Sequence, residues 1–208
     1  MDRSKNKREQ ILDIAERSVL SKGFDATSIE EIVVEANITK GGFFYHFRDK
    51  NALAIALLKR AVSVEHAVNR EILARARSLT DDPLQIVLIG LKLLAEYLEN
   101  DERPDQGSLL ATIVYQERLF NREVIDVTRE LLNENDAMRL SMLQDIADKY
   151  ELSDDIQLED LARLFNAVME GSMVQEKAFG DKTSRARNAL LYRSYLKLLF
   201  ARQKKVRQ

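Results

Sequence analysis

Apolar residues recur every three or four positions along most of the chain, and short polar segments interrupt them. This spacing is typical of amphipathic helices, each of which buries one side. In the first such segment, Ile11, Ile14 and Val19 share one side of a helix predicted over residues 5–22. Gly23 follows, and glycine readily adopts the left-handed conformation of a helix C-cap. We therefore expect the first helix to stop there.

Two short helices are predicted next. Thr27 or Ser28 can cap the second helix, because a glutamate lies three positions after each of them and completes a capping box. Asn37 tolerates the left-handed backbone of a tight turn, and Thr39 can cap a third helix that runs through Phe47. Two short helices joined by such a turn form a helix-turn-helix.

The rest of the chain predicts longer helices and one clear surface loop, DERPDQG, at residues 101–107. A helix is expected from about Lys50 to Leu79, and Asp82 followed by Pro83 marks the start of another. That helix is apolar nearly all round, so we expect it to be buried centrally. Further helical segments are predicted over residues 109–119, 124–150, 158–179 and 190–200.

Composition supports an all-α fold. The 208 residues include only 7 Gly and 2 Pro, whereas β-sandwiches and barrels need many turns rich in these residues. The absence of cysteine excludes disulfides, thiolate catalysis and cysteine-bound zinc. The longest apolar run, 52–58, is far shorter than a membrane span, and the N-terminal residues have no apolar signal-peptide core. We expect a soluble cytoplasmic protein without a membrane partner.

The formal net charge of −2 conceals an uneven distribution. Residues 1–50 balance 9 basic against 9 acidic side chains, residues 51–181 are acidic, and residues 182–208 carry 9 basic and no acidic side chains. A protein that coats nucleic acid without specificity would show a broad basic excess. Any contact with DNA is therefore expected to be confined to a small surface whose side chains are held in defined positions.

The segment TSIEEIVVEANITKGGFFYHFRDKNALA resembles the N-terminal DNA-binding domain of the TetR/AcrR family of bacterial transcriptional regulators. The resemblance covers roughly residues 8–58 and rests on the helix start, the turn 36–39, Lys40–Gly41 and the spacing of an aromatic residue, His46, Phe47 and Lys50. Asn37 stands where the family usually has Gly, and Phe44 where it usually has a phosphate-binding Tyr; Tyr45 offers a hydroxyl beside it. The resemblance implies an N-terminal three-helix DNA-binding domain at residues 1–48.

Within that domain, the third helix is expected to lie in the major groove while helix N-termini and Lys, Tyr and His donors hold phosphates. The consecutive glycines leave room for close approach of the backbone to DNA and predict few direct base contacts. The predicted contacts to double-stranded operator DNA are Thr27, Ser28, Thr39, Lys40, Gly41, Gly42, Phe44, Tyr45, His46 and Lys50.

Residues 49–208 are expected to form a helical domain that senses a ligand and dimerises. The last helix carries more apolar surface than one domain core can absorb at a chain end, which points to a partner subunit; the family resemblance implies a homodimer through the last two helices. The predicted interface comprises Ala167, Gly171, Leu191, Tyr195 and Leu198. Side chains that could line an apolar effector cavity, with ordinary core packing as the alternative, are Tyr97, Tyr115, Met138, Met142, Phe165 and Met169.

Catalytic chemistry finds little support. His46 and His66 are the only histidines, and the chain has no glycine-rich phosphate loop, nucleophile elbow or metal-spaced cluster of His and Asp. We expect no enzyme activity, cofactor or metal. The resemblance to the TetR/AcrR family instead implies a repressor that binds a palindromic operator as a dimer and is released by a small, largely apolar effector. The alternative is a helical dimeric protein-interaction module without sequence-specific DNA binding.

Overall fold

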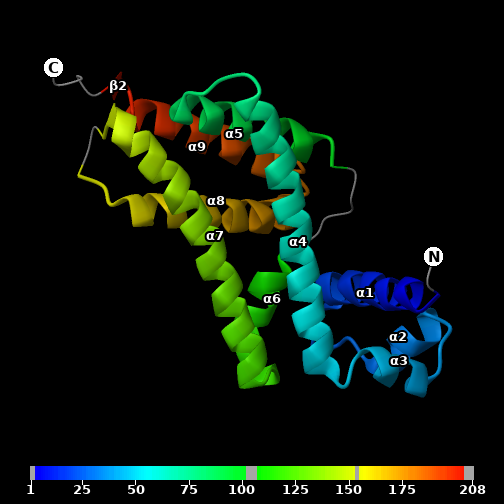
Figure 1. Ribbon diagram of the computed structural model, residues 1–208. Helices are drawn as coiled ribbons and strands as arrows, with labels where there is room; N and C mark the ends of the chain where they lie inside the picture. Colours follow the sequence, from blue (N-terminus) through cyan, green and yellow to red (C-terminus); the bar gives the residue numbers. More distant parts are fainter. Residues whose placement is uncertain (1–2, 102–106, 153–154, 204–208) are drawn as a thin grey trace. The chain divides into compact units, whose positions relative to one another are not determined.

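The computed structural model describes residues 3–101, 107–152 and 155–203, and these residues are predominantly helical (Figure 1). The all-α prediction is confirmed. The helices, in chain order, are α1 (Arg3–Lys22), α2 (Ile29–Glu35), α3 (Lys40–His46), α4 (Lys50–Arg77), α5 (Pro83–Glu99), α6 (Leu109–Tyr115), the 3-10 turn η1 (Glu117–Leu119), α7 (Arg122–Lys149), α8 (Leu158–Phe179) and α9 (Ser184–Leu199).

Two two-residue strands were not predicted. β1 (Tyr150–Glu151) directly follows α7, and β2 (Arg202–Gln203) lies just beyond α9. They pair antiparallel, with Tyr150 opposite Gln203. Strands this short are invisible to a periodicity argument, because two residues cannot establish an alternation.

The chain divides into two compact units, and two of the three division points fall inside α4 and α7. Unit 1 contains Met1–Val64 and Gly107–Leu131, and unit 2 contains Glu65–Gln106 and Leu132–Gln208. The predicted boundary after residue 48 falls inside unit 1. The observed boundary lies later in the chain, after Val64, because Leu53, Leu57 and Leu58 of α4 belong to the same buried core as α1–α3.

Unit 1 is built around apolar side chains from α1, α2, α3 and α4. Ile11 of α1, Ile32 of α2 and Phe43 of α3 are almost fully buried in one cluster. Beside this core, Arg60 of α4 pairs with Asp13 of α1 at 2.7 Å and with Glu16. Burial disfavours the charge of Arg60, but the hydrogen bonds that Arg60 donates to Glu16 and Asp13, together with their negative charges, outweigh burial and raise the pKa of the guanidinium. This cluster holds α4 against α1.

Unit 2 is organised around α5, whose Leu84, Leu88 and Leu91 are buried with residues of α7, α8 and α9. The tight contact between α5 and α9 also includes a hydrogen bond from Arg193 Nε to the Leu88 carbonyl at 2.8 Å. The prediction that α5 is central to the helical domain agrees with this packing. None of the described helices combines the length and apolar character needed to cross a bilayer.

Asp82 fixes the start of α5 and is a sensitive point for acid stability. Its carboxylate accepts hydrogen bonds from the Gln85 amide at 3.0 Å, Lys149 Nζ at 2.6 Å and Tyr150 Oη at 2.8 Å. Partial burial opposes ionisation, but these hydrogen bonds outweigh it and lower the pKa of Asp82 below its ordinary 3.8. A lowered pKa stabilises the folded state above the ordinary pKa, and that contribution is lost as pH falls through the folded-state pKa.

We expect Asp82→Asn to destabilise the protein by about 1 to 2 kcal/mol near neutral pH, because the hydrogen bonds from Lys149 and Tyr150 lose their charged acceptor, although Asn can still cap α5. The difference from the parent protein should shrink as pH falls below 3.8. Urea unfolding of both proteins across this pH range measures it. Asp81→Asn, at the exposed neighbouring position, is the matched control. A stability difference that stays constant with pH would contradict the role assigned to the Asp82 carboxylate.

Candidate functional site

The helix-turn-helix consists of α2 and α3, and local capping sets both helix starts. Ser28 Oγ accepts from the Glu31 amide at 3.1 Å, and the Glu31 carboxylate accepts from the Ser28 amide at 3.2 Å, which completes the predicted capping box. Asn37 has a φ of 50°, so the turn uses the left-handed conformation. Thr39 Oγ1 then accepts from the Gly42 amide at 3.0 Å and starts α3. The capping predictions from sequence are confirmed.

The short helix α3 presents a distinct outer surface. Its Phe43, together with Phe47 just beyond its end, is buried in unit 1 and fixes the helix on the core. Phe44 and Tyr45 point the other way, with 49% and 79% of their surfaces exposed. Gly41 is exposed too, so the helix combines a bare backbone at its start with exposed aromatic side chains. This outer surface can approach a groove closely.

The charged residues near this surface are already held by protein groups. Lys40 Nζ lies 2.7 Å from Glu30 on α2, and its hydrogen bond is the main cause of the lowered pKa of Glu30. Lys50 Nζ donates to the Phe24 carbonyl at 2.6 Å and lies 4.8 Å from the centre of the Phe24 ring. Burial lowers the pKa of Lys50. Lys40 is exposed at the surface, whereas Lys50 ties the start of α4 to the segment after α1.

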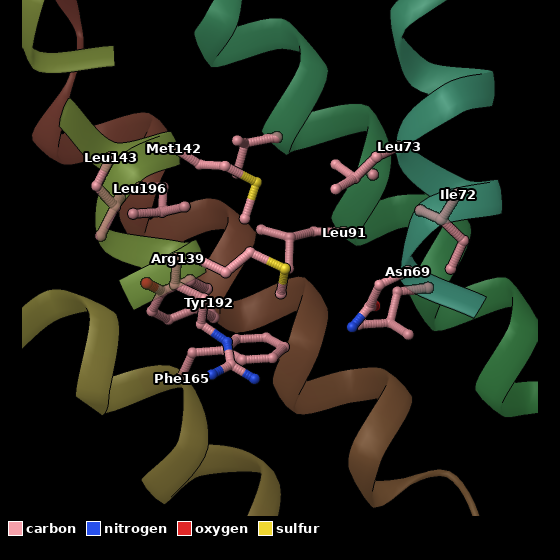
Figure 2. Close-up of a pocket in the computed structure, with 14 residues that line it drawn as sticks. Asn69, Ile72, Leu73, Leu91, Arg139, Met142, Leu143, Phe165, Tyr192 and Leu196 are labelled. Carbon is pink, nitrogen blue, oxygen red and sulfur yellow. The ribbon is translucent and has the colours of Figure 1, made fainter. Parts of the chain in front are cut away.

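A separate apolar pocket lies within unit 2, with a volume of about 90 Å³ (Figure 2). The walls come from five helices: α4 contributes Asn69, Ile72 and Leu73; α5 contributes Val87, Gly90, Leu91 and Leu94; α7 contributes Met138, Arg139, Met142 and Leu143; α8 contributes Phe165; α9 contributes Tyr192 and Leu196. Most of these side chains are hydrocarbon or thioether. Pockets of this kind, with few polar groups, are typical of small-molecule sites.

Two polar side chains in this pocket are deeply buried. Tyr192 donates its hydroxyl proton to the Leu161 carbonyl at 2.8 Å, and burial raises its pKa above the ordinary value. Arg139 is only 8% exposed, and its guanidinium lies over the Phe165 ring, 5.0 Å from the ring centre. Both side chains are labelled in Figure 2. Burial lowers the pKa of Arg139. A buried cation in an apolar pocket is costly unless it is well paired.

Comparison with known proteins identifies the family. The model described as "Bacterial regulatory proteins, tetR family" matches residues 11–57. The chain is 28% identical over 178 residues to the HTH-type transcriptional repressor BepR of Brucella suis, covering 84% of this chain and 82% of that protein. It is 27% identical over 186 residues to the repressor AcnR of Corynebacterium glutamicum, covering 88% and 87% of the two chains.

Solved structures show the same fold. A TetR transcriptional regulator from Chloroflexus aurantiacus superimposes with a TM-score of 0.73 at 21% identity, covering 98% of this chain and all of that chain. The reduced form of Escherichia coli NemR has a TM-score of 0.72 at 19% identity, covering 95% and 99%. Residues 11–57 match the TetR-family model, and over most of its length the chain is similar to HTH-type transcriptional repressors. These relatives are transcriptional regulators, so this chain is a transcriptional regulator and not an enzyme, as the sequence predicted.

The structure gathers most of the predicted DNA contacts on the helix-turn-helix. The residues from Thr39 to His46 lie on α3 or at its cap, and Ser28 caps α2. Thr27 differs, because its side chain is 1% exposed and its hydroxyl donates to the Gly23 carbonyl at 2.9 Å. The ammonium of Lys50 is also occupied inside the protein. These two side chains shape the regulator's DNA-binding region from within.

The predicted effector residues divide into two groups. Met138, Met142 and Phe165 line the pocket. Met169 packs instead against the small cluster around Ala95 and Leu98. Tyr97 and Tyr115 are 38% and 87% exposed and do not line the pocket.

Sequence reasoning missed Asn69, Arg139 and Tyr192 in this pocket. Arg139 carried a usable signal: it lies on α7 three positions before Met142 and four after Asn135, on the buried side of the helix. A charged residue on a buried helix face is unusual, so it is a candidate for ligand binding. In the described part of the chain, no cluster of His, Cys, Asp and Glu is placed to hold a metal ion.

Proposed function

We propose that this regulator binds a palindromic operator as a homodimer and is released by a small, largely apolar effector bound in the unit 2 pocket. The observation that carries the proposal is the course of α4. This single helix begins three residues after Phe47, has its first half in the core of unit 1, and lines the pocket with Asn69, Ile72 and Leu73. An effector that displaces the second half of α4 therefore acts on an element shared with the DNA-binding region. As a DNA-binding regulator, it would act in the bacterial cytoplasm.

The exposed faces of α8 and α9 support the homodimer. Leu191 and Leu198 are 66% and 72% exposed, and Tyr195 lies between them along α9 at 36%. On α8, Ala167 and Gly171 are exposed, and among the described residues no atom lies within 4 Å of a Cβ built on Gly171. Small residues at four-residue spacing let a second helix approach closely, and apolar residues beside them favour burial by a partner.

Linkage between effector and DNA tests the proposal. The effector is expected to bind the free protein about 10- to 100-fold more tightly than the operator complex, a coupling of roughly 1 to 3 kcal/mol. The operator must then weaken effector binding by the same factor. A duplex selected from a random pool provides the operator, and calorimetry with a compound found by a thermal-shift screen provides both affinities. Equal effector affinity with and without the duplex would remove the effector model and leave DNA binding untouched.

Lys40 and Tyr45 are proposed to read bases, because both are exposed on α3. We expect Lys40→Ala and Tyr45→Ala to lower discrimination between sequences by about 1 to 3 kcal/mol for each lost contact. Selection of binding sites from a random pool measures this loss. Lys59→Ala, an exposed lysine on α4, is the control. If both α3 variants select the parent consensus with undiminished preference, neither residue reads bases.

A further inference from the structure

Arg139 occupies the pocket with incomplete partners. Its Nη2 lies 3.4 Å from Glu65 of α4, and its Nη1 lies 3.9 Å from Asp136, beyond hydrogen-bond distance. Within the described residues, the buried Nη1 donates no hydrogen bond. A guanidinium offers five N–H donors in a fixed fork that suits a carboxylate or another planar anion. The contacts of Arg139 with Glu65 and Asp136 use few of these five donors.

The two neighbouring carboxylates are poorly placed to complete this pairing. Asp136 already accepts from Asn166 Nδ2 at 2.6 Å and lies 3.8 Å from Arg163 Nε. Glu65 is 46% exposed along its side chain, so water competes for its charge. Arg139 therefore stays a buried cation held by one long hydrogen bond to Glu65 at 3.4 Å and by its stack over Phe165. An anion entering from the pocket can supply the missing hydrogen bonds.

Resting on the proposed effector role of this pocket, we propose that the effector is an amphipathic anion whose charged head pairs with Arg139 in place of Glu65 while its apolar body lies against Leu73, Leu91 and Met142. The apolar walls accommodate the hydrocarbon body, and the guanidinium selects the head. Because Glu65 belongs to α4 and Arg139 to α7, this exchange also removes an ion pair between the two helices. It gives the effector a direct means of loosening α4.

Three compounds with the same six-carbon chain test the head group: hexanoate, 1-hexanol and hexylamine. We expect the parent protein to bind hexanoate about tenfold or more tightly than 1-hexanol, since hydrogen bonds to charged groups are the strong ones, and to bind hexylamine most weakly. Arg139→Gln should remove the preference by weakening hexanoate about tenfold while leaving 1-hexanol nearly unchanged. Arg129→Gln, an exposed arginine on the same helix, is the control. Titration calorimetry measures the affinities.

Glu65→Gln provides a test of opposite sign that does not depend on removing a buried side chain. It eliminates the competing carboxylate, so hexanoate affinity should rise by a few fold. Asp145→Asn, an exposed carboxylate on α7, controls for the change in net charge and should leave the affinity unchanged. If Arg139→Gln does not fold by circular dichroism, the Glu65→Gln result decides alone. A preference for 1-hexanol in the parent protein, or no gain in Glu65→Gln, overturns the anionic effector.

Operator release separates this inference from the proposed function. If 1-hexanol binds and weakens operator affinity while hexanoate does neither, the pocket is an effector site but its ligand is not an anion. If hexanoate binds through Arg139 without altering operator affinity, the ligand class holds and the effector role fails. The effector role of the pocket and the anionic ligand class are both supported when hexanoate binds more tightly than 1-hexanol and releases the operator. Both proposals fail at this pocket when none of the three compounds binds.

Discussion

Replacing Leu191 or Leu198 by Asp should convert the proposed homodimer into folded monomers. Both leucines are largely exposed on α9 in the single chain, so the substitutions leave the core of unit 2 intact. In the proposed dimer each aspartate would face the partner's apolar surface, where an unpaired buried charge costs several kcal/mol. Sedimentation velocity at micromolar concentration measures the change in mass.

A matched control comes from Leu79, which is 65% exposed and follows α4, so it belongs to neither α8 nor α9. Leu79→Asp should sediment like the parent protein. If Leu191→Asp and Leu198→Asp also remain dimeric, the α8 and α9 faces do not form the interface, and another surface must pair the two DNA-binding regions.

Replacing Tyr45 by Glu should reduce operator affinity by about 100-fold or more. The side chain is 79% exposed on the outer surface of α3, so the substitution does not disturb the buried Phe43. In the proposed complex the new carboxylate would enter the major groove, whose walls are lined by DNA phosphates, and opposing like charges at an interface costs several kcal/mol. Fluorescence anisotropy with a labelled operator duplex measures the affinity at fixed salt concentration.

Tyr115→Glu is the matched control, because Tyr115 is 87% exposed, belongs to the same compact unit and lies on α6. It carries the same change in charge and should bind the operator nearly as the parent does. Equal losses in both variants would indicate a general electrostatic effect, and no loss in either would exclude α3 from the DNA interface.

The local features of the fold could be predicted from the sequence because they depend on neighbouring residues. The caps at Ser28, Thr39 and Asp82 were predicted from the residue type and its position before an apolar run, and the predicted range 158–179 coincides with α8. The start of α9 was missed by six residues. Its first turns bury Ser184, Ala186 and Ala189, and small or polar residues give a weaker periodic signal than leucines do.

The pocket could be predicted only in part, because its walls come from residues far apart in sequence. Met138 and Met142 were found together since a helix brings positions four apart to one side. Tyr115 was chosen for its side-chain type, but its side of α6 faces solvent. Lys50 was read as a phosphate contact because nothing local revealed that the Phe24 carbonyl lies within 2.6 Å of its ammonium.

Selection from a pool of random DNA duplexes tests the central claim most directly. We predict that the parent protein enriches a palindrome whose two half-sites have centres about 34 to 36 Å apart or a multiple of that, as paired helix-turn-helix motifs require. The same selection with Leu191→Asp should lose the paired half-sites. Enrichment of no sequence by the parent protein, or of a single half-site without symmetry, would contradict the account of this chain as a dimeric operator-binding regulator.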